Sequence, residues 1–290
     1  MSVWSFEAIG TRWEIVADAP LPARTRDAVA VVIARFDAEW SRFRADSVVS
    51  RLRVRGGTVG APEDATAMLD AYRELSRATR GAVNPLIGAG LEALGYDAAL
   101  RLTPGAPQAA PQDWERLLHW SAPELTLREP AMIDVGALGK GRLVDRVAQV
   151  LASVPGRVIV DAGGDLRVRG GSARIALEHP YDPTSAIGVV EIADRALCAS
   201  GVNRRAWGDG LHHVLDARTG EPVRTWAATW AIGADAMLAD AVATALFFEG
   251  GPELAGRWGI DWVRMSTDGT AERSHGFDGE LFRSEPDRDG

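Results

Sequence analysis

The sequence predicts an α+β or mixed α/β fold in which sheets and helices pack in layers. The chain has 290 residues, of which 46% are hydrophobic and 25% charged. Apolar residues recur at three- and four-residue steps in some segments, and short β-branched runs are bounded by glycine and other turn residues in others. A chain of this length and composition can bury a sizeable core, which excludes a disordered protein.

The first half is predicted to begin with paired strands and to continue with two helices. A turn at Gly10-Thr11 divides a loosely alternating segment, and Gly81 follows the second helical pattern as a stop signal. Three prolines then indicate a surface loop. The predicted elements are a strand pair over 2–17, helices over 23–43 and 62–79, and a loop over 103–113.

The second half alternates between predicted strands and helices. Asp235 stands where it can cap the last predicted helix. Charged residues and glycines predict a frayed tail over about 275–290. The predicted strands span 131–135, 157–161, 165–169, 174–177, 188–193, 197–200 and 225–232, and the helices span 140–152 and 236–248.

Composition excludes several classes of partner. Forty acidic and 32 basic residues give a net charge of -8, so the chain lacks the basic surface that binds nucleic acid or anionic lipid. No apolar run approaches the roughly 20 residues of a membrane span, and residues 1–10 do not resemble a signal peptide. Cys198 is the only cysteine, which excludes an intramolecular disulfide. We therefore expect a cytoplasmic protein without a membrane span.

The densest chemical signal is the glycine-rich segment 133–142, in which an apolar run leads into a helix. Such a turn directs backbone N–H groups and a helix N-terminus at an anion. Lys140, in its first helical turn, is the only lysine of the chain, which points to chemistry that arginine cannot replace, although chance is the alternative. The glycine spacing fits neither a Walker loop nor the dinucleotide-binding fingerprint.

Two further segments carry candidate ligands and bases. Asp240 and Thr244 lie one helical turn apart and offer the hard oxygen ligands that Mg²⁺ prefers. The alternative is an ordinary solvated aspartate and a threonine bonded to a backbone carbonyl. Of the adjacent His212 and His213, only one can face a site if the segment is extended. The glycines of segment 161–165 are also typical of a tight hairpin.

Taken together and in this order, these segments resemble the ApbE family of FAD:protein FMN transferases. The most specific parts of the resemblance are residues 134–141, 163–165 and 213–220, together with Asp240 and Thr244. The resemblance implies one ApbE-like domain over 1–290, with mixed sheets and helices in two closely associated subdomains. It also implies an enzyme that uses Mg²⁺ and FAD, moves FMN onto a Thr or Ser hydroxyl of an acceptor flavoprotein, and releases AMP.

The resemblance also assigns roles to residues. Asp134 and Lys140 are expected to contact FAD, and Lys140 and Asp240 to act in catalysis. His213 is the candidate to accept the proton of the acceptor hydroxyl, because an imidazole titrates near neutral pH. The expected metal ligands are the Ala137 carbonyl, Asp240 and Thr244, and the other expected flavin contacts are Thr11, Ala82, Val83, Asn84 and Val214.

Two other functions fit the same residues. An FAD pyrophosphatase would let water attack and give FMN and AMP, and a scavenging protein would bind FAD without cleaving it. Asn84 departs from the family pattern, which commonly has aspartate there, so the flavin contacts of 82–84 depend on the structure. The sequence does not define the acceptor or the oligomeric state.

Overall fold

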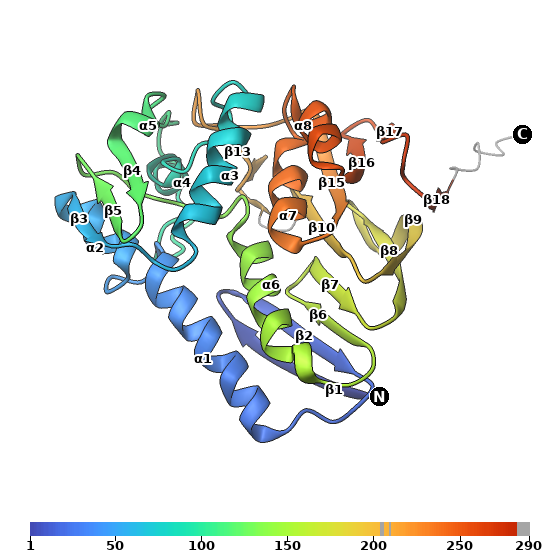
Figure 1. Cartoon of the computed structure of the whole chain (residues 1–290). Coiled ribbons are helices and arrows are strands. Elements are labelled where there is room, and N and C mark those ends of the chain that lie inside the picture. The colour runs from blue at the N-terminus through green and yellow to red at the C-terminus, as the bar shows by residue number, and fades with distance from the viewer. Residues whose placement is uncertain (204–205, 209, 283–290) are drawn as a thin grey trace, which may run out of the picture.

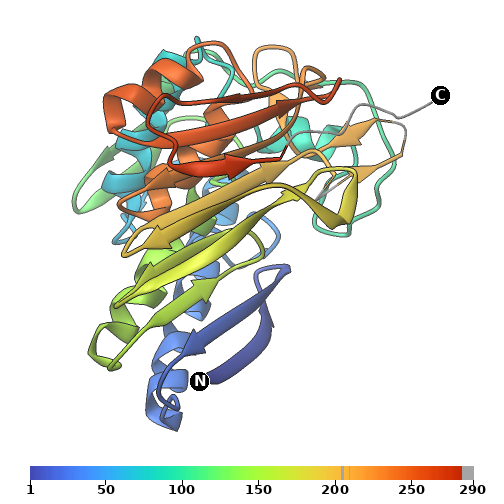
Figure 2. The same cartoon turned by 90° about the vertical axis from the view of Figure 1, so that its right-hand side faces the viewer.

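An eight-stranded antiparallel sheet forms the centre of the molecule. The computed structural model describes residues 1–203, 206–208 and 210–282. Neighbouring strands follow the order β1-β2-β6-β7-β10-β15-β16-β17, and Figure 2 shows them side by side from blue to red. Their bounds are β1 (Ser2–Ala8), β2 (Thr11–Ala17), β6 (Val158–Asp161), β7 (Asp165–Arg169), β10 (Ala196–Gly201), β15 (Trp226–Gly233), β16 (Asp261–Ser266) and β17 (Ala271–Arg273).

A layer of helices covers one face of this sheet (Figure 1). The larger of the hydrophobic cores lies between them and includes Trp13 and Ile15 of β2 and Leu143 of α6, none of which is exposed to solvent. Apolar side chains at helical spacing thus meet one face of the strands. The helices are α1 (Ala23–Trp40), α3 (Ala65–Ala78), α6 (Gly139–Val150), α7 (Ala236–Ala245) and α8 (Gly251–Trp258).

A three-stranded sheet covers the opposite face. It has the order β18-β9-β8, formed by β8 (Ser172–His179), β9 (Asp182–Ala193) and β18 (Gly279–Leu281). In β15, Ala231 belongs to the helical core, whereas its neighbours Trp230 and Ile232 belong to the second core beneath this smaller sheet. The two-residue alternation of a strand therefore builds both cores at once.

Shorter elements surround these layers. A second three-stranded sheet has the order β3-β5-β4 and packs near α3. The remaining elements are α2 (Val48–Arg55), β3 (Gly57–Gly60), α4 (Gly88–Ala93), α5 (Trp114–Leu117), β4 (Leu118–Ser121), β5 (Glu124–Leu127), the 3-10 turn η1 (Leu151–Ser153), β11 (Ala206–Trp207), β12 (Leu211–His212), β13 (Leu215–Asp216) and β14 (Glu221–Pro222).

The mixed fold and most of the long elements agree with the sequence analysis, but two local predictions are wrong. Residues 131–135 do not form the predicted strand. Instead, the Asp134 N–H donates to the Pro85 carbonyl at 2.8 Å, so the apolar run packs as irregular chain. Part of the predicted frayed tail is strand β18, which is paired with β9, and Phe277 beside it is buried. Residues 283–290 of that tail lie outside the described residues, as do residues 204 and 205.

The predicted loop over 103–113 is irregular chain that ends in a turn, and backbone hydrogen bonds anchor it at two places. The Gly105 N–H donates to the Ala93 carbonyl at 2.7 Å, and the Ala110 N–H donates to the Ala217 carbonyl at 2.8 Å. Among the residues that the structure describes, no helix is both long enough and apolar enough to cross a membrane.

Candidate active site

A buried cluster of charges joins the start of α6 to β7 and α7. The Lys140 ammonium lies 2.9 Å from Asp165 Oδ2, and the Asp165 side chain is only 1% exposed. The Asp165 carboxylate also acts electrostatically on the buried Asp240 of α7. The fold therefore brings together three residues from distant parts of the sequence.

Electrostatics in this cluster are dominated by burial. Loss of solvent raises the pKa of Asp240 well above its ordinary value, and the nearby Asp165 carboxylate raises it further, whereas Lys140 lowers it. Burial likewise raises the pKa of Asp161, at the end of β6. Carboxylates outnumber ammonium groups here, so the cluster favours an additional cation.

Two predicted oxygen ligands meet beside this cluster. The Thr244 hydroxyl donates to the Ala137 carbonyl oxygen at 3.2 Å. Asp240, one turn earlier on α7, accepts the Gly141 N–H through Oδ2 at 2.9 Å. The α7 helix therefore contacts both the turn before α6 and the first turn of α6.

The sequence predicts that the backbone N–H groups of the turn from Asp134 to Gly139 point at an anion, but they bond within the protein instead. The Gly136 N–H donates to Asp134 Oδ1 at 2.7 Å, and the Ala137 N–H donates to the Tyr72 hydroxyl at 3.3 Å. The amides of residues 138 and 139 both donate to the Val135 carbonyl. These N–H groups are used within the protein, so the attraction that this segment offers an anion is that of a positive charge, Lys140, which Asp165 holds at 2.9 Å.

Sequence reasoning missed two residues that hold this turn. Arg42, just beyond α1, donates from Nε to Asp134 Oδ2 at 2.6 Å and from Nη1 to the Tyr96 carbonyl at 2.9 Å. Tyr72 of α3 donates from its hydroxyl to the Asp134 carbonyl at 3.0 Å. The sequence did contain a signal for Tyr72, because a tyrosine on the buried face of a helix needs a hydrogen-bond partner for its hydroxyl.

Close packing fixes α6 against α7. A Cβ atom at Gly141 would collide with the Ala236 carbonyl and lie 2.7 Å from Asp240 Cβ, so only glycine permits this approach. Asp145 of α6 accepts the N–H groups of Ala236 at 3.0 Å and Met237 at 2.9 Å. The N-terminus of α7 is therefore capped by a side chain of α6.

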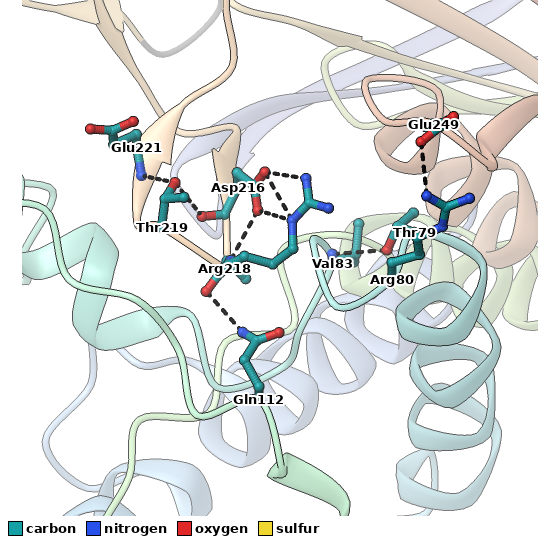
Figure 3. A network of polar contacts seen from close by, with 10 residues as sticks. Thr79, Arg80, Val83, Gln112, Asp216, Arg218, Thr219, Glu221 and Glu249 are labelled. Atoms are coloured by element: carbon teal, nitrogen blue, oxygen red, sulfur yellow. Dashed lines mark hydrogen bonds and ion pairs between the residues drawn. The ribbon is translucent and has the colours of Figure 1, made fainter.

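Backbone hydrogen bonds join three of the predicted binding segments. The Ala217 N–H donates to the Ala82 carbonyl at 2.9 Å, and Pro85 accepts from Asp134 as described above. The Val83 N–H donates to Thr79 Oγ1 at 3.0 Å, and Gln112 Nε2 donates to the Ala217 carbonyl at 3.1 Å (Figure 3). Segments 82–85 and 213–217 are thus connected to the turn before α6.

The buried Asn84 amide is used within the protein. Its Nδ2 donates to the Pro111 carbonyl at 2.9 Å, and its Oδ1 accepts the Leu86 N–H at 2.9 Å. These two bonds give Asn84 a structural role in holding the loop. Its predicted flavin contact stays a prediction, as do those of Ala82 and Val83.

The histidine pair divides as expected for an extended segment. His212 is buried and pairs through Nε2 with the Val223 carbonyl at 2.8 Å, and its Nδ1 accepts the Val214 N–H at 3.3 Å. Burial lowers the pKa of His212, which favours the neutral ring. His213 is half-buried beside it, and Val214 is buried. His213 thus remains the better candidate for a base, because His212 is committed to the backbone.

Thr11 lies at the start of β2, next to the β6–β7 hairpin. Gly163 in that hairpin has φ of +69°, and a Cβ atom there would collide with Thr11 Oγ1. The hairpin interpretation of the glycines is therefore correct. It also places Thr11 near the strand that carries Asp165, although the predicted FAD contact of Thr11 stays untested.

The donor set fits a hard divalent cation. Ala137 offers a carbonyl, Thr244 a hydroxyl and Asp240 a buried carboxylate whose pKa is raised by burial, so a cation would offset an electrostatic cost already present. Among the described residues, no group of three or more His, Cys, Asp or Glu side chains is arranged for a metal ion. Mg²⁺ commonly uses only one or two carboxylates with substrate phosphates, so it is the ion that this set suits.

The model of the ApbE family matches residues 9–261, and the chain therefore belongs to the ApbE family. An FAD:protein FMN transferase of Rhodobacter capsulatus is 27% identical over 294 residues, which cover 91% of this chain and 55% of that protein. One of Treponema pallidum (strain Nichols) is 29% identical over 242 residues, which cover 72% of this chain and 67% of that protein. The chain thus spans about half the length of the first relative and two thirds of the second.

Solved structures share the fold. The crystal structure of the ApbE protein of Thermotoga maritima superimposes with a TM-score of 0.81 at 23% identity and covers 94% of this chain and 97% of that one. The apo form of the Pseudomonas stutzeri flavinyl transferase ApbE gives a TM-score of 0.79 at 22% identity, with coverage of 96% and 95%. At these identities the likeness shows the architecture.

Proposed function

We propose that this protein is a Mg²⁺-dependent transferase that moves FMN from FAD to a Thr or Ser hydroxyl of an acceptor flavoprotein and releases AMP. Membership of the ApbE family and the names of its relatives support this class of activity. The observation that carries the proposal is the buried Lys140–Asp165–Asp240 cluster beside the Ala137–Thr244 contact. It combines a point charge for phosphate with oxygen ligands for a cation.

In this reaction the acceptor oxygen forms a bond to the phosphorus of the FMN moiety, and the bond from that phosphorus to the AMP oxygen breaks. His213 accepts the hydroxyl proton, and AMP leaves with the bonding electron pair. Lys140 holds the pyrophosphate, and Asp165 keeps the ammonium in place at 2.9 Å. Ala137, Asp240 and Thr244 would hold Mg²⁺. When bound, the ion would stabilise the charge on the phosphate oxygens.

One assay tests the proposal against its alternatives. The purified protein is incubated with FAD and Mg²⁺, with or without a flavoprotein domain that carries the acceptor motif implied by the resemblance to the ApbE family, Asp-x-x-(Ser/Thr)-Gly-Ala-(Ser/Thr). AMP is quantified, and mass spectrometry detects an FMN phosphodiester on the domain. AMP together with a labelled domain supports transfer. AMP without label would instead establish an FAD pyrophosphatase, and bound FAD without AMP would establish a scavenging protein.

The Asp240→Ala variant tests the role of the carboxylate in the same assay. We expect turnover to fall by about a hundredfold or more, because charge stabilisation by a metal ion contributes several kcal/mol to phosphoryl transfer. Asp27→Ala, at an exposed position on α1, is the matched control and should keep full activity. Wild-type turnover in Asp240→Ala would remove the metal assignment.

A further inference from the structure

Tyr72 connects the helical layer to the turn that carries a proposed metal ligand. It lies in α3 and is 1% exposed, and its ring belongs to the larger core. Its hydroxyl nevertheless reaches two backbone groups of the turn before α6. It donates to the Asp134 carbonyl at 3.0 Å and accepts the Ala137 N–H at 3.3 Å.

These two bonds span the turn from its first residue to its fourth. Between them lies Gly136, whose lack of a side chain leaves the backbone free to rotate. The Gly136 N–H is held by the Asp134 carboxylate, which is in turn held by Arg42. The N–H of Ala137 is held by Tyr72.

The Ala137 carbonyl is the group whose direction depends on this arrangement. Thr244 is its described hydrogen-bond donor, at 3.2 Å, and in the proposed function both oxygens would bind the cation. The Thr244 proton would then point away from the cation that the two oxygens share, so the hydroxyl would no longer fix the carbonyl. The carbonyl is then restrained from both sides of Ala137: the Leu138 N–H, which shares its peptide plane, donates to the Val135 carbonyl at 3.2 Å, and the Ala137 N–H donates to Tyr72 at 3.3 Å.

We propose that Tyr72 is a positioning residue that holds the Ala137 carbonyl oxygen in the direction needed to bind a divalent cation. The inference rests on the proposed function, since it takes Ala137 as a metal ligand. Removal of a group that hydrogen-bonds to a metal ligand and orients it commonly changes metal affinity by 10- to 100-fold. Burial, and then the charge of Asp134, raise the pKa of Tyr72 well above its ordinary value, so the hydroxyl keeps its proton as the donor to Asp134.

Tyr72→Phe removes the one atom that makes both bonds and keeps the ring in the core. A matched control lies one turn further along α3, where the Ser76 hydroxyl accepts the Trp114 Nε1–H at 3.1 Å. Ser76→Ala also deletes a buried hydrogen bond from this helix but leaves the turn untouched. Thermal melts followed by circular dichroism establish that both variants fold.

The experiment combines two measurements on the full chain. Mn²⁺ alone is titrated into each protein, and the free ion is followed by electron paramagnetic resonance. Amide hydrogen exchange is measured in peptides covering residues 134–141 without metal. We expect Tyr72→Phe to bind Mn²⁺ about tenfold more weakly and to exchange the Ala137 amide faster, whereas Ser76→Ala matches wild type in both.

The remaining outcomes overturn the inference in distinguishable ways. Equal Mn²⁺ affinity in wild type and Tyr72→Phe would overturn the role of Tyr72 while leaving the proposed function intact. Equal weakening in both variants would show a general effect of loosening α3. No Mn²⁺ binding by the wild-type protein would overturn this inference, because the Ala137 carbonyl would then hold no cation in the protein alone, whereas AMP release from FAD with a labelled acceptor domain tests the proposed function separately.

Discussion

The ammonium group of Lys140 lies 2.9 Å from Asp165, and 21% of the lysine side chain is exposed. Its partial exposure leaves it open to a ligand, while the buried carboxylate restricts where it can point. A guanidinium is planar and larger, so it cannot occupy the same place as a compact ammonium. The absence of any other lysine from the chain is consistent with a requirement at this position.

We therefore predict that Lys140→Arg lowers flavin transfer at least about tenfold, even though the charge is conserved. Arg142→Lys is the control, because Arg142 lies two residues further on and pairs with Asp64 at 2.7 Å. Its activity should stay close to that of wild type. Initial rates of AMP release measure both variants, and a fully active Lys140→Arg would mean that the lone lysine is a matter of chance.

His212 gives the protein a pH-dependent stability. Its pKa is lowered by burial from the ordinary value of 6.5, so the unfolded chain takes up a proton at a higher pH than the folded chain. The contribution of neutral His212 to the free energy of unfolding is fully present above pH 6.5. It is lost as the pH falls from 6.5 through the lower pKa of the folded protein. A proton on Nδ1 would also face the Val214 N–H, which that nitrogen now accepts at 3.3 Å.

Replacing this histidine should flatten that part of the pH profile. We predict that His212→Gln has a smaller decrease in the free energy of unfolding than wild type between about pH 7 and pH 5. Urea unfolding at several pH values measures this. His119→Gln, at an exposed position on β4, should keep the wild-type profile. A wild-type slope in His212→Gln would show that another group is responsible.

Sequence analysis identified polar residues within motifs better than the partners that hold them. Lys140, Asp240 and Thr244 stood out through rarity or spacing, and the fold does bring their segments together. Arg42 and Tyr72 contact the same turn from 92 and 62 residues away in sequence. Such pairings depend on how the helices pack against each other. The periodicity of apolar residues in a single sequence does not show which helices will be neighbours.

At the scale of elements, the site depends on the fixed relation between α6 and α7. Asp145 accepts two backbone N–H groups of α7 and pairs with Arg167 of β7. Asp235 provides a second cap by accepting the Leu238 N–H at 2.9 Å. The two carboxylates differ in kind, because Asp235 stabilises its own helix whereas Asp145 joins two helices and a strand.

This difference predicts unequal costs of removal. Asp145→Ala should lower the free energy of unfolding by about 3 kcal/mol, because it leaves a guanidinium and two buried amides without their partner. Asp235→Ala, which removes an ordinary cap, should cost about 1 kcal/mol. Urea denaturation followed by circular dichroism compares the two. Equal losses would contradict a connecting role for Asp145.

The sequence predicted elements well where one periodicity was long and uninterrupted, as in α1, α3, α6 and α7. It failed for residues 131–135, whose apolar run is equally suited to a strand and to buried irregular chain. That segment has Pro85 rather than a strand as its hydrogen-bond partner. Short elements such as α2 and β3 were also missed, because four to eight residues give too little pattern to separate structure from loop.

At the scale of the whole molecule, the central sheet is shared by two hydrophobic cores. Cys198 of β10 faces the helical core, whereas Leu197 beside it faces the core under the smaller sheet. Because these strands contribute side chains to both cores, loss of either core would expose apolar residues of the shared sheet. We therefore propose that residues 1–282 unfold as one domain, consistent with the single-domain interpretation of the sequence.

Matched core variants test this proposal. Leu143 of α6 and Leu177 of β8 are both fully buried, the first in the helical core and the second in the other. Truncation of either to alanine should cost about 2 to 5 kcal/mol. Because the sheet is common to both cores, each variant should lower the midpoint of a single urea transition, with the same midpoint by far-ultraviolet circular dichroism and by tryptophan fluorescence. If Leu177→Ala instead produced an early transition that left the helical core folded, the two halves would be separate cooperative units.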